Sequence, residues 1–140
     1  MLERLNYYLT KIEASIVEGE KLVATRDPAL SGRIRQRCVD AAVLIGAYQL
    51  FVHRELFEPM MRDGDELQRR TVCDLKIECI ALTRDLQSSV KAFATSEEPL
   101  DWLALATRSN GFNHLIRVHL SRVRALTASV PGQPAGVRAA

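Results

Sequence analysis

Cysteine, net charge and long hydrophobic runs are all scarce in this sequence. Only three cysteines occur among its 140 residues, at positions 38, 73 and 79, and no two of them form a CxxC pair. An odd number without paired spacing argues against a disulfide-linked secreted protein and favours a reducing cytoplasm. Nineteen Lys and Arg stand against seventeen Asp and Glu, and this net charge of +2 is too small to indicate nucleic acid as a partner.

The most apolar stretch, residues 41–52, is too short to cross a bilayer. The first residues also lack the apolar run of a signal peptide, so we expect a soluble, cytoplasmic protein with no membrane partner. Hydrophobic residues still make up 47% of the chain, which excludes a disordered protein. A chain of 140 residues can bury a core without disulfides or a structural metal.

Sustained alternation of polar and apolar residues, which is typical of strands, is absent as well. Apolar residues instead recur at helical spacing in four long segments with short connections. This pattern predicts an all-α protein, an up-down antiparallel four-helix bundle. The four apolar stripes comprise Leu2, Leu5, Leu9, Ile12, Ile16 and Val23; Ile34, Cys38, Ala41, Ile45, Tyr48, Val52, Leu56 and Pro59; Val72, Leu75, Cys79, Leu82, Leu86, Val90 and Phe93; and Phe112, Ile116, His119, Val123, Leu126 and Val130.

Residues typical of helix ends separate the four segments. Asp27 followed by Pro28 predicts the cap and first residue of the second helix. Gly64 is expected to be left-handed at the end of that helix, with Asp65 capping the third. Ser96, which precedes two glutamates, is expected to cap the fourth, which should begin near Leu100.

One domain, residues 1–131, accounts for the whole helical pattern. Gly111 interrupts the last stripe, and we expect a close contact between helices there. Pro131 should end the last helix, so residues 132–140 are predicted to form a disordered tail.

Folding the chain about its predicted turns brings ionisable side chains to one height. At ~1.5 Å rise per residue on each side of Gly64, His53 lies level with Asp74, and Gln49 with Glu78. Folding again about residue 96 brings the last helix beside these acids. Imidazoles and carboxylates from different helices are the ligands of metal sites in helical bundles, although no ExxH or HExxH pair is present. The predicted layer holds His53, Asp74, Glu78, His114 and His119, with Tyr7 or Tyr8 from the first helix.

Three stretches of this sequence resemble hemerythrin-like domains. Residues 53–65 resemble the end of their second helix, residues 74–78 the start of their third, and residues 114–119 the spacing of a histidine and an acid in their last. The ligand types differ from the family pattern. The family's second-helix histidine and acid fall on Gln49 and His53, and its last-helix acid on His119. The third-helix histidines are replaced by Asp74 and Glu78, and the first-helix histidine by Tyr8 or Leu9.

The resemblance implies a hemerythrin-like bundle that holds iron or another divalent metal. The implied ligands are His53, Asp74, Glu78, His114 and His119. Such a centre would sense oxygen, nitric oxide or redox state, or store a metal.

Two other functions are compatible with the same residues. The first is a metal-free regulatory or adaptor module that acts through protein contacts, as a homodimer or with another protein. Its contact face would use Leu44, Leu50, Phe51 and Phe57. The second, the least favoured, is an enzyme that uses the histidine and carboxylate layer as acid and base.

Structural roles also explain each of these residues. His119 lies in an apolar stripe, so a buried histidine bonded to Asp74 or Glu78 accounts for it without a metal. His53 fits a surface position near a helix end, and Asp74 and Glu78 fit a solvated acidic pair. The three cysteines fit small core residues, and the arginines at 33, 35 and 37 fit a solvated face.

Overall fold

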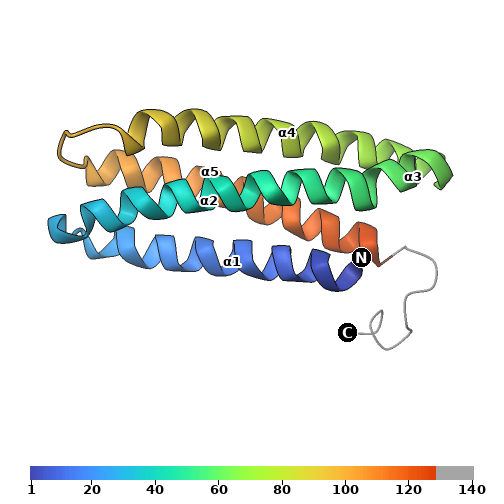
Figure 1. The fold of residues 1–140 in the computed structure, drawn as a ribbon, viewed down its shortest axis with the longest axis horizontal. Coiled ribbons are helices and arrows are strands. Elements are labelled where there is room, and N and C mark those ends of the chain that lie inside the picture. The colour runs from blue at the N-terminus through green and yellow to red at the C-terminus, as the bar shows by residue number, and fades with distance from the viewer. Residues whose placement is uncertain (129–140) are drawn as a thin grey trace.

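The computed structural model describes residues 1–128, and every regular element in that range is helical. Four long helices, α1 (Leu2–Thr25), α2 (Ser31–Val52), α4 (Glu66–Ala94) and α5 (Trp102–Thr127), lie side by side along the long axis of the molecule (Figure 1). Three short elements complete the chain: the 3-10 helix η1 (Pro28–Leu30), the π-helix η2 (His53–Phe57) and α3 (Glu58–Asp63). The prediction of an all-α helical bundle is confirmed.

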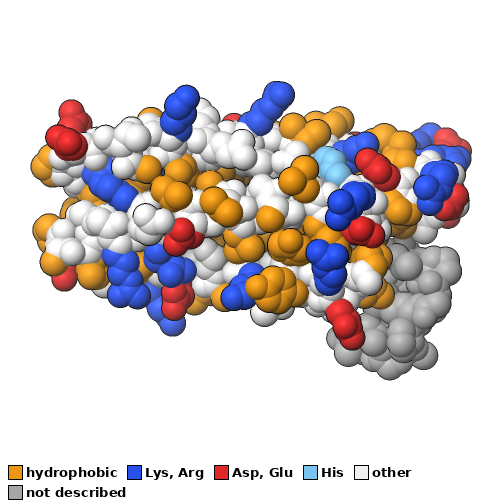
Figure 2. All heavy atoms as spheres, viewed as in Figure 1, with side chains coloured by type: hydrophobic (Ala, Val, Ile, Leu, Met, Phe, Trp, Pro, Cys, Tyr) orange, Lys and Arg blue, Asp and Glu red, His pale blue; other side chains and the backbone are white. Residues whose placement is uncertain are grey.

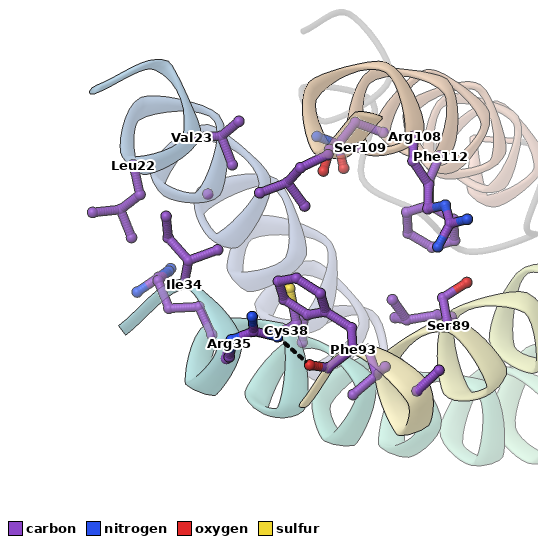
Figure 3. Close-up of a pocket in the computed structure, with 18 of the residues that line it drawn as sticks. Leu22, Val23, Ile34, Arg35, Cys38, Ser89, Phe93, Arg108, Ser109 and Phe112 are labelled. Atoms are coloured by element: carbon purple, nitrogen blue, oxygen red, sulfur yellow. Dashed lines mark hydrogen bonds between the residues drawn. The ribbon is translucent and has the colours of Figure 1, made fainter. Parts of the chain in front are cut away.

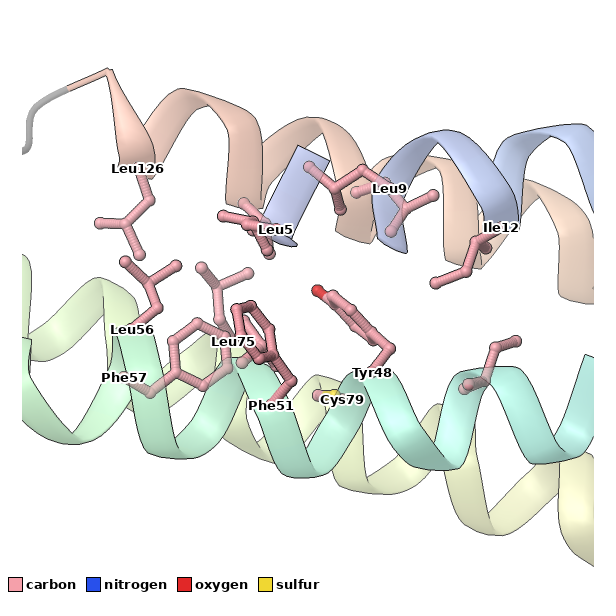
Figure 4. Packing of buried hydrophobic residues seen from close by; sticks show 14 of the residues in the cluster. Leu5, Leu9, Ile12, Tyr48, Phe51, Leu56, Phe57, Leu75, Cys79 and Leu126 are labelled. Carbon is pink, nitrogen blue, oxygen red and sulfur yellow. The ribbon is translucent and has the colours of Figure 1, made fainter. Parts of the chain in front are cut away.

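The four long helices close into a ring around one core. Helix α1 contacts α2 and α5, and α4 contacts the same two helices. The core occupies the half of the molecule nearest α3, where the apolar stripes of all four helices meet (Figure 4). In the opposite half, buried side chains are sparse, with Ile34 and Val90 as the main examples. The molecule therefore has one closely packed half and one open half.

Helix α2 continues into α3 through the widened π turn η2. The backbone N–H of Glu58 donates to the carbonyl of His53, five residues earlier, instead of four. Pro59 lies two residues after the end of this turn, and a proline inside a helix crowds the carbonyl four residues earlier and lacks an N–H donor. The widened turn also changes which side chains face the core, because it adds one residue. Phe57 is fully buried as a result.

The structure overturns part of the predicted contact face, and the widened turn accounts for this at Phe57 alone. Phe51 and Phe57 are core residues with 3% and 0% exposure, and Leu44 is partly buried. Phe51 packs its ring against Tyr8 of α1, with centroids 5.2 Å apart. Of the four residues predicted for this face, Leu50 alone is exposed, at 74%.

The turn between α3 and α4 keeps its predicted cap but not its predicted glycine conformation. The Asp65 carboxylate accepts the backbone N–H of Gln68 at 2.8 Å, and the Gln68 side chain accepts the N–H of Asp65 at 3.0 Å. Gly64 is extended, at φ −76° and ψ 165°, so the prediction of a left-handed residue was wrong. Glycine is needed there for space, since a Cβ would collide with the carbonyl oxygen of Met60. The left-handed residue is Arg26, at φ 51° after α1.

Helix α5 begins later than predicted. Its cap is Asp101, whose carboxylate accepts the N–H of Ala104 at 3.1 Å, and Ser96 is therefore not the cap. The Ser96 hydroxyl instead accepts the N–H of Glu98 at 3.2 Å within the connection.

Two other sequence expectations also change. Asp27 caps η1, where its carboxylate accepts the N–H of Ala29 at 3.0 Å, and α2 follows from Ser31. Gly111 faces open space, so the predicted close helix contact is wrong. The expectations for Val130, Pro131 and residues 132–140 lie outside the described residues. No helix within residues 1–128 is both long and apolar enough to cross a membrane.

Candidate functional site

Two features could carry function: a chain of polar residues through the packed half and a cavity in the open half. In the packed half, Tyr48 and His119 are both fully buried. Figure 4 shows Tyr48 pointing from α2 into the core among apolar side chains. Its hydroxyl lies 2.9 Å from Nε2 of His119, on α5. Each polar atom in this contact therefore has a partner, as buried groups require.

The second nitrogen of His119 connects the buried pair to the surface. Nδ1 lies 2.7 Å from Oε1 of Glu78 on α4, and Oε2 of Glu78 accepts from Arg122 at 2.7 Å. Because the Glu78 carboxylate only accepts, Nδ1 carries the proton, and Nε2 accepts from the Tyr48 hydroxyl. We call Tyr48, His119, Glu78 and Arg122 the polar chain.

Burial sets the protonation of the two inner members of the polar chain. Desolvation lowers the pKa of His119, against the opposing effect of its hydrogen bond to Glu78. Desolvation also raises the pKa of Tyr48 well above its usual range, with smaller contributions from Cys79 and Glu78. The tyrosine therefore stays a donor, the imidazole is neutral at pH 7, and the Glu78–Arg122 ion pair holds the charge.

The structure brings together only part of the predicted metal layer. Glu78 and His119 meet, which is the contact expected of a buried histidine. Asp74 and His114 are exposed. His53 is half-buried, its Nε2 lacks a hydrogen-bond partner, and burial, followed by the charge of Lys76, lowers its pKa.

These residues, as they lie, do not fit a metal centre. Both carboxylate oxygens of Glu78 and both nitrogens of His119 already have protein partners. In the part of the chain that the structure describes, no three or more His, Cys, Asp or Glu side chains are placed to hold a metal ion. The metal centre therefore stays a prediction from the sequence.

Sequence reasoning missed two members of the polar chain, the partly exposed Arg122 and the buried Tyr48. Tyr48 was assigned to the apolar stripe of the second helix, which is correct for its ring. Its hydroxyl was the available signal, because a buried tyrosine usually finds a hydrogen-bond partner. Tyr48 also precedes Gln49, which the turn about Gly64 had placed level with Glu78.

The open half contains a cavity of about 920 Å³. It lies between the four long helices, at the end of the molecule with the α1–α2 and α4–α5 connections (Figures 1 and 3). Apolar side chains from all four helices line it, including Val23, Ile34, Phe93 and Phe112. Ser89 and Ser109 add small polar groups to the wall. The cavity is therefore mainly apolar, with isolated polar groups.

Three arginines line the same cavity. Arg35 donates to the carbonyls of Phe93 and Glu98, the second at 2.7 Å, and ties α2 to the connection after α4 (Figure 3). Arg37 pairs with Glu18 at 2.8 Å, but its Nε is buried and has no hydrogen-bond partner among the described residues. Arg108 is exposed and forms no hydrogen bond or ion pair with residues 1–128. Donors for a polar ligand group are thus available on the cavity wall.

Together the fold and these features define an all-α bundle with a polar chain through one half and an apolar cavity in the other. Comparison with protein-family models, with curated proteins and with solved structures gives no significant match. The function is therefore inferred from the cavity and the surface of the molecule.

Proposed function

We propose that this protein is a binding module that takes a small, mainly apolar molecule with one polar end into the cavity of its open half. The observation that carries the proposal is the contrast between the two halves of one bundle. Four amphipathic helices that close a tight core around Tyr48 also surround about 920 Å³ of space further along. Ligand pockets in proteins span roughly 300–1,000 Å³ and are mainly apolar with a few polar groups.

The arginines support the polar end of this ligand. The partnerless Nε of Arg37 is a buried donor, and leaving such a donor unsatisfied costs ~1–3 kcal/mol. A carbonyl, hydroxyl or carboxylate oxygen on the ligand would accept from it. Arg108 on α5, which has no ion-pair partner within residues 1–128, offers a second cation. The apolar body of the ligand would then contact Ile34, Phe93 and Phe112.

A dye-binding experiment tests the proposal. An environment-sensitive apolar dye should bind the protein saturably, with one dye per chain, and a medium-chain alcohol should displace it. Ser89→Trp would fill the cavity, so we expect the dye affinity to fall at least tenfold, which corresponds to ~1.4 kcal/mol. Ser121→Trp, on the exposed side of α5, is the matched control and should leave the affinity unchanged. Equal dye binding by both variants would exclude the cavity as the site.

We also propose that the bundle has the up-down order of hemerythrin-like domains. The short connections between successive long helices support this order. The contact between Glu78 of α4 and His119 of α5 also supports the resemblance. It joins two positions that the resemblance aligns with the metal ligands of hemerythrin-like domains. In this proposal a hydrogen-bonded polar chain occupies the place of the metal centre.

A further inference from the structure

The outward face of α2, continued by Arg54 at the start of η2, carries a regular stripe that the bundle itself does not use. Its residues follow the spacing 4-3-4-3-4, which is the repeat of a coiled-coil seam. Val43 and Leu50 are 69% and 74% exposed, so two large apolar side chains lie in solvent one heptad apart. Ala47 lies between them, and its small side chain permits close approach of another helix. The stripe consists of Gln36, Asp40, Val43, Ala47, Leu50 and Arg54.

The neighbouring helix widens this apolar surface. Ile77 of α4 is 70% exposed and Ile80 is 36% exposed. Helix α4 packs against α2 beside a small residue, since a Cβ added at Gly46 would lie 3.8 Å from Nε2 of Gln87. Figure 2 shows hydrophobic side chains along the middle band of this face, with charged groups along its edges and at its ends. Extended exposed apolar surfaces usually mark a contact with another protein.

The charges on the stripe are self-complementary. Asp40 lies seven residues before Ala47 and Arg54 lies seven residues after it. If two copies of α2 cross antiparallel with their Ala47 residues together, each Asp40 faces Arg54 of the other copy at equal height. Such an isologous contact uses one surface twice, as two-fold dimers do.

Both charges remain available for this contact. The carboxylate of Asp40 accepts only from the neutral amide of Gln36, at 3.0 Å. Arg54 pairs with the adjacent Glu55 at 3.2 Å, in an exposed contact that stabilises little. In a parallel pairing, by contrast, Asp40 would meet Asp40 and Arg54 would meet Arg54.

We propose that this protein forms a two-fold homodimer in which the α2 helices of two copies pack antiparallel about Ala47. Val43 and Leu50 form the apolar centre of the contact, Asp40 and Arg54 pair between the copies at both ends, and Ile77 and Ile80 cover its flank. The interface lies on the outward surface of the bundle and does not depend on ligand binding in the cavity.

Analytical ultracentrifugation across a concentration series tests the dimer. The 140-residue chain, kept reduced because Cys73 is exposed, should shift from its monomer mass of 15.7 kDa toward twice that mass. Leu50→Asp places a carboxylate in the apolar centre and should leave a monomer at every concentration. Leu67→Asp is the matched control: Leu67 is equally exposed, at 73%, but lies off the stripe, and its substitution should leave dimerisation unchanged.

Charge reversal tests the antiparallel register. Asp40→Arg and Arg54→Asp should each weaken the dimer at least tenfold, because each places like charges opposite one another. The double variant restores opposite charges and should recover the wild-type dissociation constant. A wild-type protein that stays monomeric at all concentrations would overturn the proposal, as would a double variant weaker than both single variants. Circular dichroism of each variant shows that these exposed substitutions leave the helices intact.

Discussion

His119 is a neutral imidazole at the centre of the bundle, held between a tyrosine that donates and a carboxylate that accepts. The sequence was sufficient to predict that this histidine is buried and meets Asp74 or Glu78, because helical periodicity and the turn about residue 96 bring it beside both acids. The structure selects Glu78. The sequence was not sufficient to identify Tyr48 as the other partner. Whether a tyrosine ring directs its hydroxyl at a given side chain depends on the relative rotation of two helices, which periodicity does not specify.

The lowered pKa of His119 predicts that the fold is less stable in acid. An imidazole with a lower pKa in the folded protein binds its proton more readily when the chain unfolds, so acidification favours unfolding. The stabilising contribution is fully present above the unfolded pKa, ~6.5, and is lost as the pH falls through the folded value. We expect the urea concentration at the midpoint of unfolding to decrease when the pH is lowered from 7 to 5.

A matched variant separates this effect from other titrations. His53 also has a lowered pKa, so the comparison should be made in a His53→Gln background. His119→Gln in that background should flatten the pH dependence, although it destabilises the protein at pH 7. An equally steep dependence in the double variant would assign the effect to other groups.

The hydrogen bonds that Glu78 and His119 already form predict how the protein responds to metal. Iron could bind Glu78 and His119 only if it displaced Arg122 or Tyr48 from its present bond. We therefore expect protein loaded anaerobically with ferrous iron to retain none after desalting, and a chelator to leave the thermal midpoint unchanged. Elemental analysis measures the first and calorimetry the second. Iron that is retained by the wild type and lost in His119→Ala would instead support the hemerythrin-like metal centre.

The helices and the caps at Asp27 and Asp65 follow from local sequence signals that act over a few residues. The π turn does not, because it depends on how the α2–α3 segment fits the core around Pro59. Phe57 was consequently assigned to the surface, since an uninterrupted α-helix would turn it outward. Gly64 was assigned the conformation usual for glycine after a helix, whereas the structure uses its small size.

The crowding at Gly64 predicts that alanine substitutions at Gly64 and Gly111 change the stability of the fold in opposite directions. Gly64→Ala should lower the free energy of unfolding by ~1–3 kcal/mol, since a Cβ would meet the carbonyl of Met60 and the Gln68 side chain that completes the capping box. Gly111→Ala, in the middle of α5 with open space around it, should raise that free energy by ~0.5–1 kcal/mol. Urea denaturation measures both. Equal effects of the two substitutions would contradict the steric role of Gly64.

At the scale of the whole molecule, the packed and open halves should differ in local stability. Amide protection reflects the number of buried apolar contacts around each helix segment. Amides of α5 near Leu120, which is fully buried, should therefore exchange at rates close to global unfolding. Amides near Arg108, beside the cavity, should exchange faster.

Native-state hydrogen exchange measured by mass spectrometry checks this difference along α5. Addition of a cavity ligand should slow exchange only for the amides near Arg108. Uniform protection along α5 would contradict it.

The π turn has a consequence for how the chain tolerates changes in length. A π turn holds one residue more than the α turn it replaces. Removing Glu55, which lies within it, would restore an ordinary turn and keep the side chains on both sides directed into the core. The same excision in the middle of α4 would rotate every following side chain by ~100° and turn Leu82, Leu86 and Val90 away from the core. Gaps of one residue in related sequences are therefore expected at positions 53–57.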